Sequence, residues 1–411
     1  MTNRVQVADT AIVRLCLLVF GNTFSVGAFT VLLPAIGRSE GLSDVALGAV
    51  AAAFGLARLL TDLPAGFFIT HRLRRALWLG PLVLAAGLLI MCAGGPAWTL
   101  IAGRFLLGVG HSLNMLAGIT LIIRHVRLER QSLSLNAFEM TGMLGVLGGI
   151  VLAGLLPFDW SWPQLLLVAS SPQLLVLLSL PGLLQRLPVD APHDGPRRRS
   201  IDLFRPPVST APGIASAPPI VTFDRLALLG LAAGAAIAFS WSSIGTFLLP
   251  LRADRDFSLE RKGVAMLTAL PQLVDVMVLL PFGILADRVG RARMLAFAML
   301  MMAVAVFAIT FGGIGVASGG AVLLGLALAG WMLPISLINR AARPEEIAWR
   351  AGLYRLSVDT GIFLGPLAAG FVIGWMGAWP LGLMLSAVLL ALGISLLKTR
   401  QRDGVAGASR P

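Results

Sequence analysis

The sequence predicts an all-α membrane protein in which twelve transmembrane helices form two six-helix repeats. Three observations predict this fold. Of the 411 residues, 57% are hydrophobic and only 13% are charged, whereas a soluble domain carries about 25% charged residues. Twelve apolar runs are long enough to cross a bilayer. Sequence elements of the first half return in the same order in the second half.

The composition excludes several classes of protein. A chain with so few charged residues cannot cover a water-facing surface, which excludes a soluble enzyme, a disordered protein and a nucleic-acid-binding domain. The net charge of +12 does not require nucleic-acid binding, because basic residues in a membrane protein hold loops in the cytoplasm. Cys16 and Cys92 lie in apolar runs and predict no disulfide framework.

The apolar runs are predicted to be helices because an open strand cannot satisfy its backbone groups in lipid. The first run is too long for a signal peptide and is expected to remain as a helix. The twelve expected spans are Thr10–Leu33, Val45–Ile69, Ala76–Gly94, Trp98–Ile123, Leu133–Leu156, Gln164–Leu184, Leu226–Leu249, Val264–Ala286, Met294–Ile314, Gly319–Ile338, Ala351–Trp375 and Pro380–Leu397.

Basic residues predict the orientation and the domain boundaries. Arginines concentrate in alternate loops, which places both termini in the cytoplasm and the chain in the inner membrane. Residues 186–223 hold eight prolines and three consecutive arginines, and are expected to be a cytoplasmic linker between the halves 1–185 and 224–398. Contact of this basic segment with anionic headgroups is the alternative. Residues 399–411 form a cytoplasmic tail.

The two halves repeat at the level of single residues. Thr30–Pro34 returns as Thr246–Pro250, and Arg130, Glu139 and Gly145 match Arg350, Asp359 and Gly365 at one constant offset. Two six-helix units in the same orientation form a parallel repeat, and transporters built in this way hold their site between the units, near the midplane.

Three motifs resemble those of the major facilitator superfamily. The segment Gly283–Arg291, with Gly283 and Gly290, is similar to the family's signature loop. Arg104, Gly108 and Gly110 match its Arg-x-x-x-Gly-x-Gly motif, and Gly361, Gly365 and Pro366 match an element associated with antiporters. The resemblance implies a transporter that works by alternating access.

The first-half copy of the signature loop departs from the family pattern. It keeps Gly66 and Arg74, but Thr70 stands in place of the acid and Leu73 in place of the second glycine. In the family this loop helps to latch the cytoplasmic ends of the halves together. The first-half latch is therefore expected to be weaker, and the second-half latch, built on Asp287, Arg288 and Arg291, to be intact.

Ionisable residues inside the predicted spans are functional candidates because their burial in lipid is costly. Arg58 and Asp62 lie four residues apart on one helix face. Asp359 is expected at the same depth, and an Arg58–Asp359 ion pair is predicted to close one side of the cytoplasmic gate. Contact with substrate or proton is the alternative role for these residues.

Glu139 and Asp275 are the candidates for proton coupling. The repeat and the family fold would bring them together across the contact between the fifth and eighth spans. Two close carboxylates cannot both be ionised cheaply, so one would carry a proton. Separate bridges to Arg288 or Arg130 are an equally weighted alternative.

The resemblance also implies a substrate cavity lined by the first, fourth, seventh and tenth spans. Arginine, histidine, amide and tryptophan side chains there would suit a small organic molecule. The candidate lining residues are Asn22, Ser25, Arg104, His111, Asn114, Trp241, Ser243, Thr246, Trp331 and Ser336.

The sequence therefore predicts a secondary transporter of a small organic molecule, acting as a monomer, coupled to protons and with a slight preference for export. Uptake of a small organic anion and a non-transporting receptor are the alternatives. The chain has no Gly-Lys phosphate loop, no His-Glu-x-x-His motif and no metal-spaced cysteines. No enzyme activity, cofactor, metal or nucleic-acid partner is expected.

Overall fold

The computed structural model describes residues 2–126, 128–185, 223–340, 342 and 346–408. All regular secondary structure in these residues is helical. Ten of the helical segments are long and apolar enough to cross a membrane, which confirms the predicted fold class. Apart from Phe223, the predicted linker lies outside the described residues.

The described residues of the first half form seven helices. They are α1 (Thr2–Asn22), α2 (Phe24–Ser39), α3 (Asp44–Cys92), α4 (Ala97–His125), α5 (Leu128–Leu155), α6 (Trp162–Ala169) and α7 (Ser171–Gln185). α1 and α2 form one predicted span interrupted at Thr23, and α6 and α7 another interrupted at Ser170.

Helix α3 accounts for two predicted spans. Its 49 residues extend for about 70 Å of helix, more than twice the thickness of a bilayer core. The backbone leaves the helical region at Arg72, with φ −140° and ψ 48°. Both arms pack on α4, where Gly108 meets Phe54 and Gly110 meets Leu84. The chain therefore reverses near Arg72, in agreement with the two predicted spans Val45–Ile69 and Ala76–Gly94.

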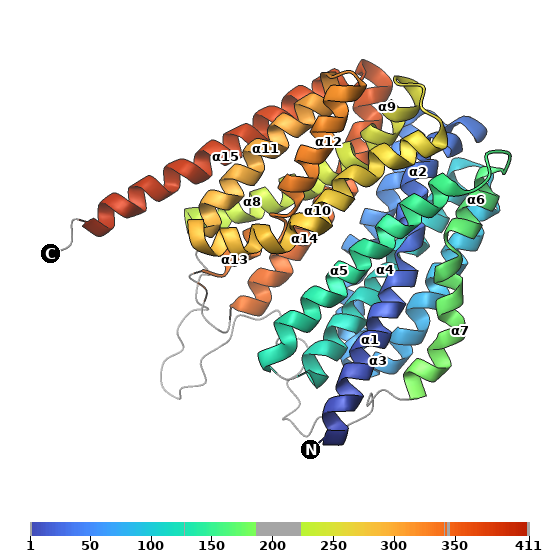
Figure 1. Ribbon diagram of the computed structural model, residues 1–411, viewed down its shortest axis with the longest axis horizontal. Helices are drawn as coiled ribbons and strands as arrows, with labels where there is room; N and C mark the ends of the chain where they lie inside the picture. The colour runs from blue at the N-terminus through green and yellow to red at the C-terminus, as the bar shows by residue number, and fades with distance from the viewer. Residues whose placement is uncertain (1, 127, 186–222, 341, 343–345, 409–411) are drawn as a thin grey trace, which may run out of the picture.

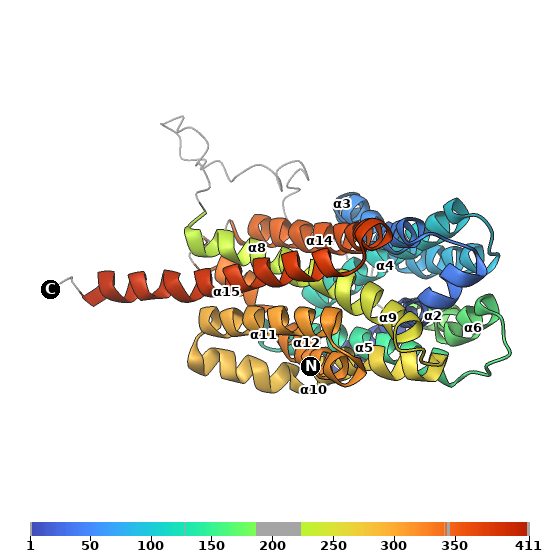
Figure 2. The ribbon, with the colours of Figure 1, turned by 90° about the horizontal axis from the view of Figure 1, so that it is seen from above.

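The second half also begins with an interrupted helix. Its elements are α8 (Arg225–Ser240), a π-helical stretch (Trp241–Leu248), α9 (Leu249–Arg255), α10 (Arg261–Val289), α11 (Arg291–Phe311), α12 (Ile314–Leu328), α13 (Leu333–Ile338), α14 (Ile347–Met376) and α15 (Trp379–Ala408). Figure 1 shows the two halves as adjacent bundles, and Figure 2 shows their helices running along a common long axis.

The same interhelical contact occurs at the interruption in each half. The Thr23 hydroxyl donates to the carbonyl of Gly142 on α5, at 2.9 Å. The Ser242 hydroxyl donates to the carbonyl of Gly361 on α14, at 3.1 Å. In both cases the partners are 119 residues apart, so the two halves form similar contacts between corresponding helices.

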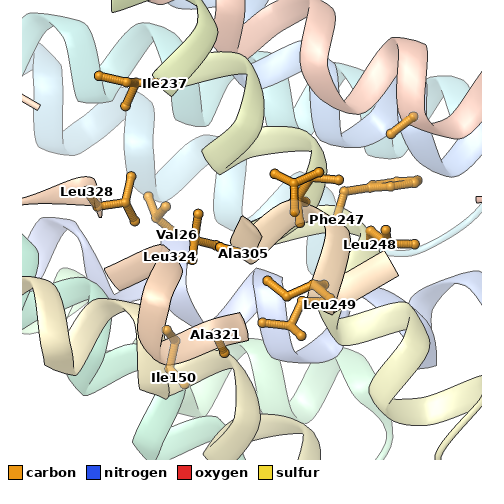
Figure 3. Packing of buried hydrophobic residues seen from close by; sticks show 14 of the residues in the cluster. Val26, Ile150, Ile237, Phe247, Leu248, Leu249, Ala305, Ala321, Leu324 and Leu328 are labelled. Carbon is orange, nitrogen blue, oxygen red and sulfur yellow. The ribbon is translucent and has the colours of Figure 1, made fainter. Parts of the chain in front are cut away.

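The halves meet at one end of the bundle, which we call the closed end. There Arg38 pairs with Asp254, Arg255 pairs with Asp44 at 2.7 Å, and Arg261 donates to the Pro157 carbonyl at 2.6 Å. The largest buried apolar cluster continues across this junction, with Val26 and Ile150 of the first half and Leu249 and Leu324 of the second (Figure 3).

The opposite end, where α1 begins and α15 finishes, we call the open end. The two bundles diverge toward it (Figure 1). The structure therefore shows halves that are joined at one end and separated at the other.

Two glycines of α3 test this difference. A Cβ at Gly48 would lie 2.6 Å from the Pro366 carbonyl oxygen of α14, whereas one at Gly66 would lie in open space. We expect Gly48→Ala to destabilise the joined form by about 1–3 kcal/mol, as overpacking does. We expect Gly66→Ala to be neutral or stabilising by up to about 1 kcal/mol. Thermal unfolding in detergent measures both, and equal effects would contradict the assigned packing.

Candidate functional site

Four charged residues connect α3 of the first half with α14 of the second. A guanidinium nitrogen of Arg58 lies 2.6 Å from a carboxylate oxygen of Asp359. Arg355 donates to Asp62 and lies 4.0 Å from Asp359. Asp359 is only 1% exposed. We call these residues the tetrad.

The spacing of the charges explains why the pairs are reciprocal. Each helix carries an arginine followed four residues later by an aspartate, so both charges lie on one face. α3 and α14 pass each other in opposite directions, which sets each arginine opposite the other helix's aspartate. Every buried charge of the tetrad thus has an opposite charge beside it, as a buried ion pair requires.

The tetrad does not close the open end. Arg58 was expected to pair with Asp359 in the cytoplasmic gate, and the pair is present. However, it is formed in a conformation whose open end is separated. Arg58 lies midway between Asp44 and Arg72 along the first arm of α3. The contact therefore lies near the middle of the helices, where the joined part of the interface gives way to the separated part.

Two further ionisable residues lie near the tetrad. Glu139 of α5 is within electrostatic range of Arg355 and Arg58. The ring of His111 on α4 packs at a tilt against Phe54, with centroids 5.2 Å apart, and His111 also lies within electrostatic range of both arginines. The structure thus places one predicted proton-coupling residue and one predicted cavity residue in the same charged region.

Asp275 of α10 lies in a different environment. It is 4% exposed, and its Oδ1 atom has no hydrogen-bond partner among the described residues. Glu139 instead interacts with the tetrad arginines. The expected face-to-face pair of Glu139 and Asp275 is therefore not formed in this conformation.

A small cavity lies between the halves on the face of α10 that carries Asp275. Thr268, Pro271 and Gln272 line it and share this face through their helical spacing. Trp241 and Thr246 line the opposite wall, and Val26, Thr30, Val146 and Ile150 complete it from the first half. Its volume of about 20 Å³ holds about one water molecule.

Irregular helix geometry positions the two predicted tryptophans. Trp241 begins the π-helical stretch, and Trp331 lies in the break between α12 and α13. Their rings stand edge to face, with centroids 6.1 Å apart. The only tyrosine of the chain, Tyr354, donates to the Trp331 carbonyl at 2.7 Å and satisfies a group that the break leaves free. π-Helical segments are frequent at functional sites.

Arg104 is a buried cation stacked between two aromatic rings. Its guanidinium carbon lies 3.9 Å from the centroid of Phe29 and 4.7 Å from that of Phe54. The residue is 6% exposed, and Nε and one terminal nitrogen have no hydrogen-bond partner among the described residues. Cation–π contact stabilises such a charge but leaves its hydrogen-bonding capacity unused.

The remaining predicted cavity residues divide into three groups. Asn22 and Ser25 are buried at the α1–α2 interruption, and their side-chain polar atoms have no hydrogen-bond partner within the described part of the chain. Ser243 is buried and donates to its own helix at Phe239. Asn114 lies against Gly80 between α4 and the second arm of α3, and Ser336 lines a separate cavity beside Gly290 toward the open end. These last two residues are therefore placed away from the central cavity.

The signature loop lies on the exposed surface of the open end. Asp287 and Arg291 pair with each other at 3.1 Å and are 67% and 54% exposed. Arg74 and Arg288 are also exposed. In this conformation the Asp287–Arg291 pair lies within the second half, as expected when the halves are apart at this end.

The motif glycines serve local geometry. Gly290 has φ +106°, which favours glycine, at the junction of α10 and α11. A Cβ at Gly361 would lie 2.6 Å from the Ala235 carbonyl oxygen, and one at Gly365 would clash with Ser242. These glycines therefore allow α14 to approach α8 and the π-helical stretch closely.

Arg355 was one of the ionisable residues found inside the predicted spans but was given no partner, although it lies four residues before Asp359, the same spacing as in Arg58 and Asp62. Two residues of the site, Gln272 and Tyr354, were missed as candidates. Gln272 lies on the Asp275 face at helical spacing. Tyr354 carries no pattern in sequence, because its partner is a backbone carbonyl freed by a helix break. Among the described residues, no group of three or more metal-ligand side chains gathers to hold a metal ion.

The ion pairs of the tetrad can be tested one partner at a time. We expect Arg58→Ala to destabilise the protein by about 3–5 kcal/mol, because it leaves Asp359 buried without its closest cation. Exchanging the charges, with Arg58→Asp and Asp359→Arg together, should recover much of this loss. Arg291→Ala, which breaks an exposed pair, should cost less than about 1 kcal/mol. Thermal unfolding measures all three, and equal losses for Arg58→Ala and Arg291→Ala would contradict the assignment.

Comparison with known proteins places this architecture in a family. A model described as the Major Facilitator Superfamily matches residues 15–265 and 230–410. A solved structure of the peptide transporter POT in complex with sulfate has a TM-score of 0.76 at 14% identity, and covers 97% of this chain and 98% of that chain. A solved structure of the nucleoside transporter NupG has a TM-score of 0.69 at 12% identity, and covers 94% of this chain and 98% of that chain. The comparison with curated proteins gave no match. The chain belongs to the Major Facilitator Superfamily and is a transporter rather than an enzyme.

Proposed function

We propose that this transporter exports a lipophilic small organic molecule in exchange for protons, by alternating access. The halves 1–185 and 224–398 are the moving bodies, and the tetrad is the contact about which they rock. The observation that carries the proposal is the 4% exposed carboxylate of Asp275, whose Oδ1 has no hydrogen-bond partner among the described residues and which shares a helix face with the cavity-lining Thr268, Pro271 and Gln272.

A buried carboxylate of this kind is suited to carry a proton. An ionised carboxylate without a partner in a membrane protein is costly, whereas the protonated form is not. Asp62 and Asp359 already have arginines beside them. Asp275 has no arginine beside it among the described residues. Protonation should therefore stabilise Asp275 more than it would stabilise Asp62 or Asp359.

The cavity lining supports a lipophilic substrate. Val26, Val146, Ile150, Trp241 and Pro271 form its apolar wall, and Thr30, Thr246, Thr268 and Gln272 are its polar groups. The conformation with the open end separated would receive substrate from the side that the open end faces. The arginine-rich loops favour the cytoplasm as that side, which supports export.

A second function, uptake of a small organic anion, is favoured by one observation. Arg104 is a buried cation with no carboxylate beside it among the described residues and with unused hydrogen-bond donors. A substrate carboxylate could supply the missing acceptor once the halves rearrange. One of the similar structures is of a POT family transporter in complex with 5-aminolevulinic acid, a ligand that carries such a group.

Replacing the proposed proton carrier tests coupling. A substrate is first identified by the thermal stabilisation it gives in panels of lipophilic amines and dyes and of small carboxylates. In proteoliposomes we expect Asp275→Asn to reduce transport driven by a pH gradient at least tenfold. Counterflow, which needs no net proton movement, should keep at least half of its rate.

Glu139→Gln is the matched control for this experiment. Glu139 has arginines within electrostatic range, so its loss should change gradient-driven transport less than the loss of Asp275 does. Full gradient-driven transport in Asp275→Asn would rule out Asp275 as the proton carrier.

Arg104 separates export from anion uptake. If export is correct, ligands from the lipophilic panel stabilise the protein, and Arg104→Gln leaves their affinity within about threefold. Trp241→Ala should weaken the same ligands about tenfold through loss of ring contact. Stabilisation by carboxylates alone, abolished in Arg104→Gln, would instead establish the anion carrier.

A further inference from the structure

A second cavity between the halves lies at the closed end. It has a volume of about 230 Å³, more than ten times that of the small cavity lined by Trp241, Thr268 and Gln272. Residues of α2, α6 and the α5–α6 loop form one wall, and residues of α9 and α10 form the other. Neither Asp275 nor the tetrad lines it.

The first-half wall of this cavity is aromatic. Phe158, Trp160 and Trp162 all line it. Trp162 is fixed by a hydrogen bond from Nε1 to Glu40, at 2.8 Å. Phe158 is 60% exposed and lies under the guanidinium of Arg261, 5.0 Å from its centroid. Such a wall binds a flat aromatic ring through offset or edge contacts.

The charged residues of the lining favour an anion. They are two guanidinium groups, Arg38 and Arg261, and one carboxylate, Asp254. One terminal nitrogen of Arg38 donates to Asp254, and the side chain is 63% exposed. Its remaining donors therefore face solvent and can bind a carboxylate. Asp159, which is near Arg261, is not part of the lining.

The cavity exists only while the closed end is joined. Arg38–Asp254 and the bond from Arg261 to the Pro157 carbonyl cross between the halves at its walls. Separation of the halves at this end would break both contacts and divide the lining between two bodies. A ligand bound here would therefore stabilise the joined form by its full binding free energy.

We propose that this cavity is a regulatory site for small aromatic carboxylates, distinct from the transport site. Its occupation holds the closed end together and stops the transport cycle with the open end accessible. By the orientation proposed above, the ligand enters from outside the cell. A ligand at about 100 times its dissociation constant would shift the equilibrium toward the joined form about 100-fold.

The test uses the full chain in lipid nanodiscs, with Cys16 and Cys92 replaced by alanine and a reporter cysteine at Ala265. Ala265 is 4% exposed and packs against Gly154 of the other half, so a maleimide reaches it only when the closed end separates. The probes are indole-3-acetate, neutral indole and cationic tryptamine. We expect indole-3-acetate to slow labelling at least tenfold, indole to slow it less, and tryptamine to leave it unchanged.

Two tryptophans provide the matched variants. Trp160→Ala removes a ring from the cavity and should raise the concentration of indole-3-acetate needed for half protection about tenfold. Trp98→Ala removes a 70% exposed ring at the same end but outside the cavity and should change nothing. If Trp160→Ala does not fold, Phe158→Ala replaces it, because Phe158 is largely exposed.

Three results would overturn the proposal. The first is no protection by indole-3-acetate at any concentration. The second is equal protection by tryptamine, which would show that charge plays no part. The third is equal loss in Trp98→Ala, which would show non-specific partition into the membrane. None of these results bears on Asp275, so failure here is distinguishable from failure of the proposed proton coupling.

Discussion

The cost of placing a charge in hydrocarbon is the constraint on which this structure depends. Two arginines and two aspartates at mid-membrane depth are tolerated because α3 and α14 set each charge beside an opposite one. These partners belong to different halves, so the requirement for pairing is also what holds the halves in register. The same constraint makes Asp275 the proposed proton carrier, because this buried carboxylate has no cation beside it among the described residues.

The contact between the halves changes character along α3. Toward the closed end it is made of small residues, where Gly48 and Gly55 bring the backbones of α3 and α14 together. At the tetrad the contact between the halves is made by ion pairs, and at Gly66, beyond the tetrad, the halves are no longer in contact. A glycine contact requires close approach, whereas long arginine side chains tolerate changes of helix angle. The tetrad is therefore suited to persist while the glycine contact forms and separates.

The fold was predictable because hydropathy, the arginine pattern and the repeat act over long segments. The ion pair of Arg58 with Asp359 was also accessible, since spacing and the repeat placed both at one depth. The neighbours of Glu139 and Asp275 could not be predicted, because they depend on the rotation of each helix about its axis. Apolar periodicity does not determine this rotation when lipid and protein are equally apolar. Ser336 and Asn114 illustrate the same limit: their helices were predicted correctly, but the faces they occupy were not.

The central claim is that the halves rock about a retained mid-membrane contact, and paired distance measurements test it most directly. In liposomes, spin labels at Pro96 and Gly315 report on the closed end, and labels at Arg72 and Arg293 report on the open end; all four residues are exposed or lie in loops. The account predicts two populations at each pair, with the closed-end distance lengthening as the open-end distance shortens when pH or ligand changes. A single unchanging distance at both ends would contradict it and would favour a static receptor on a transporter fold.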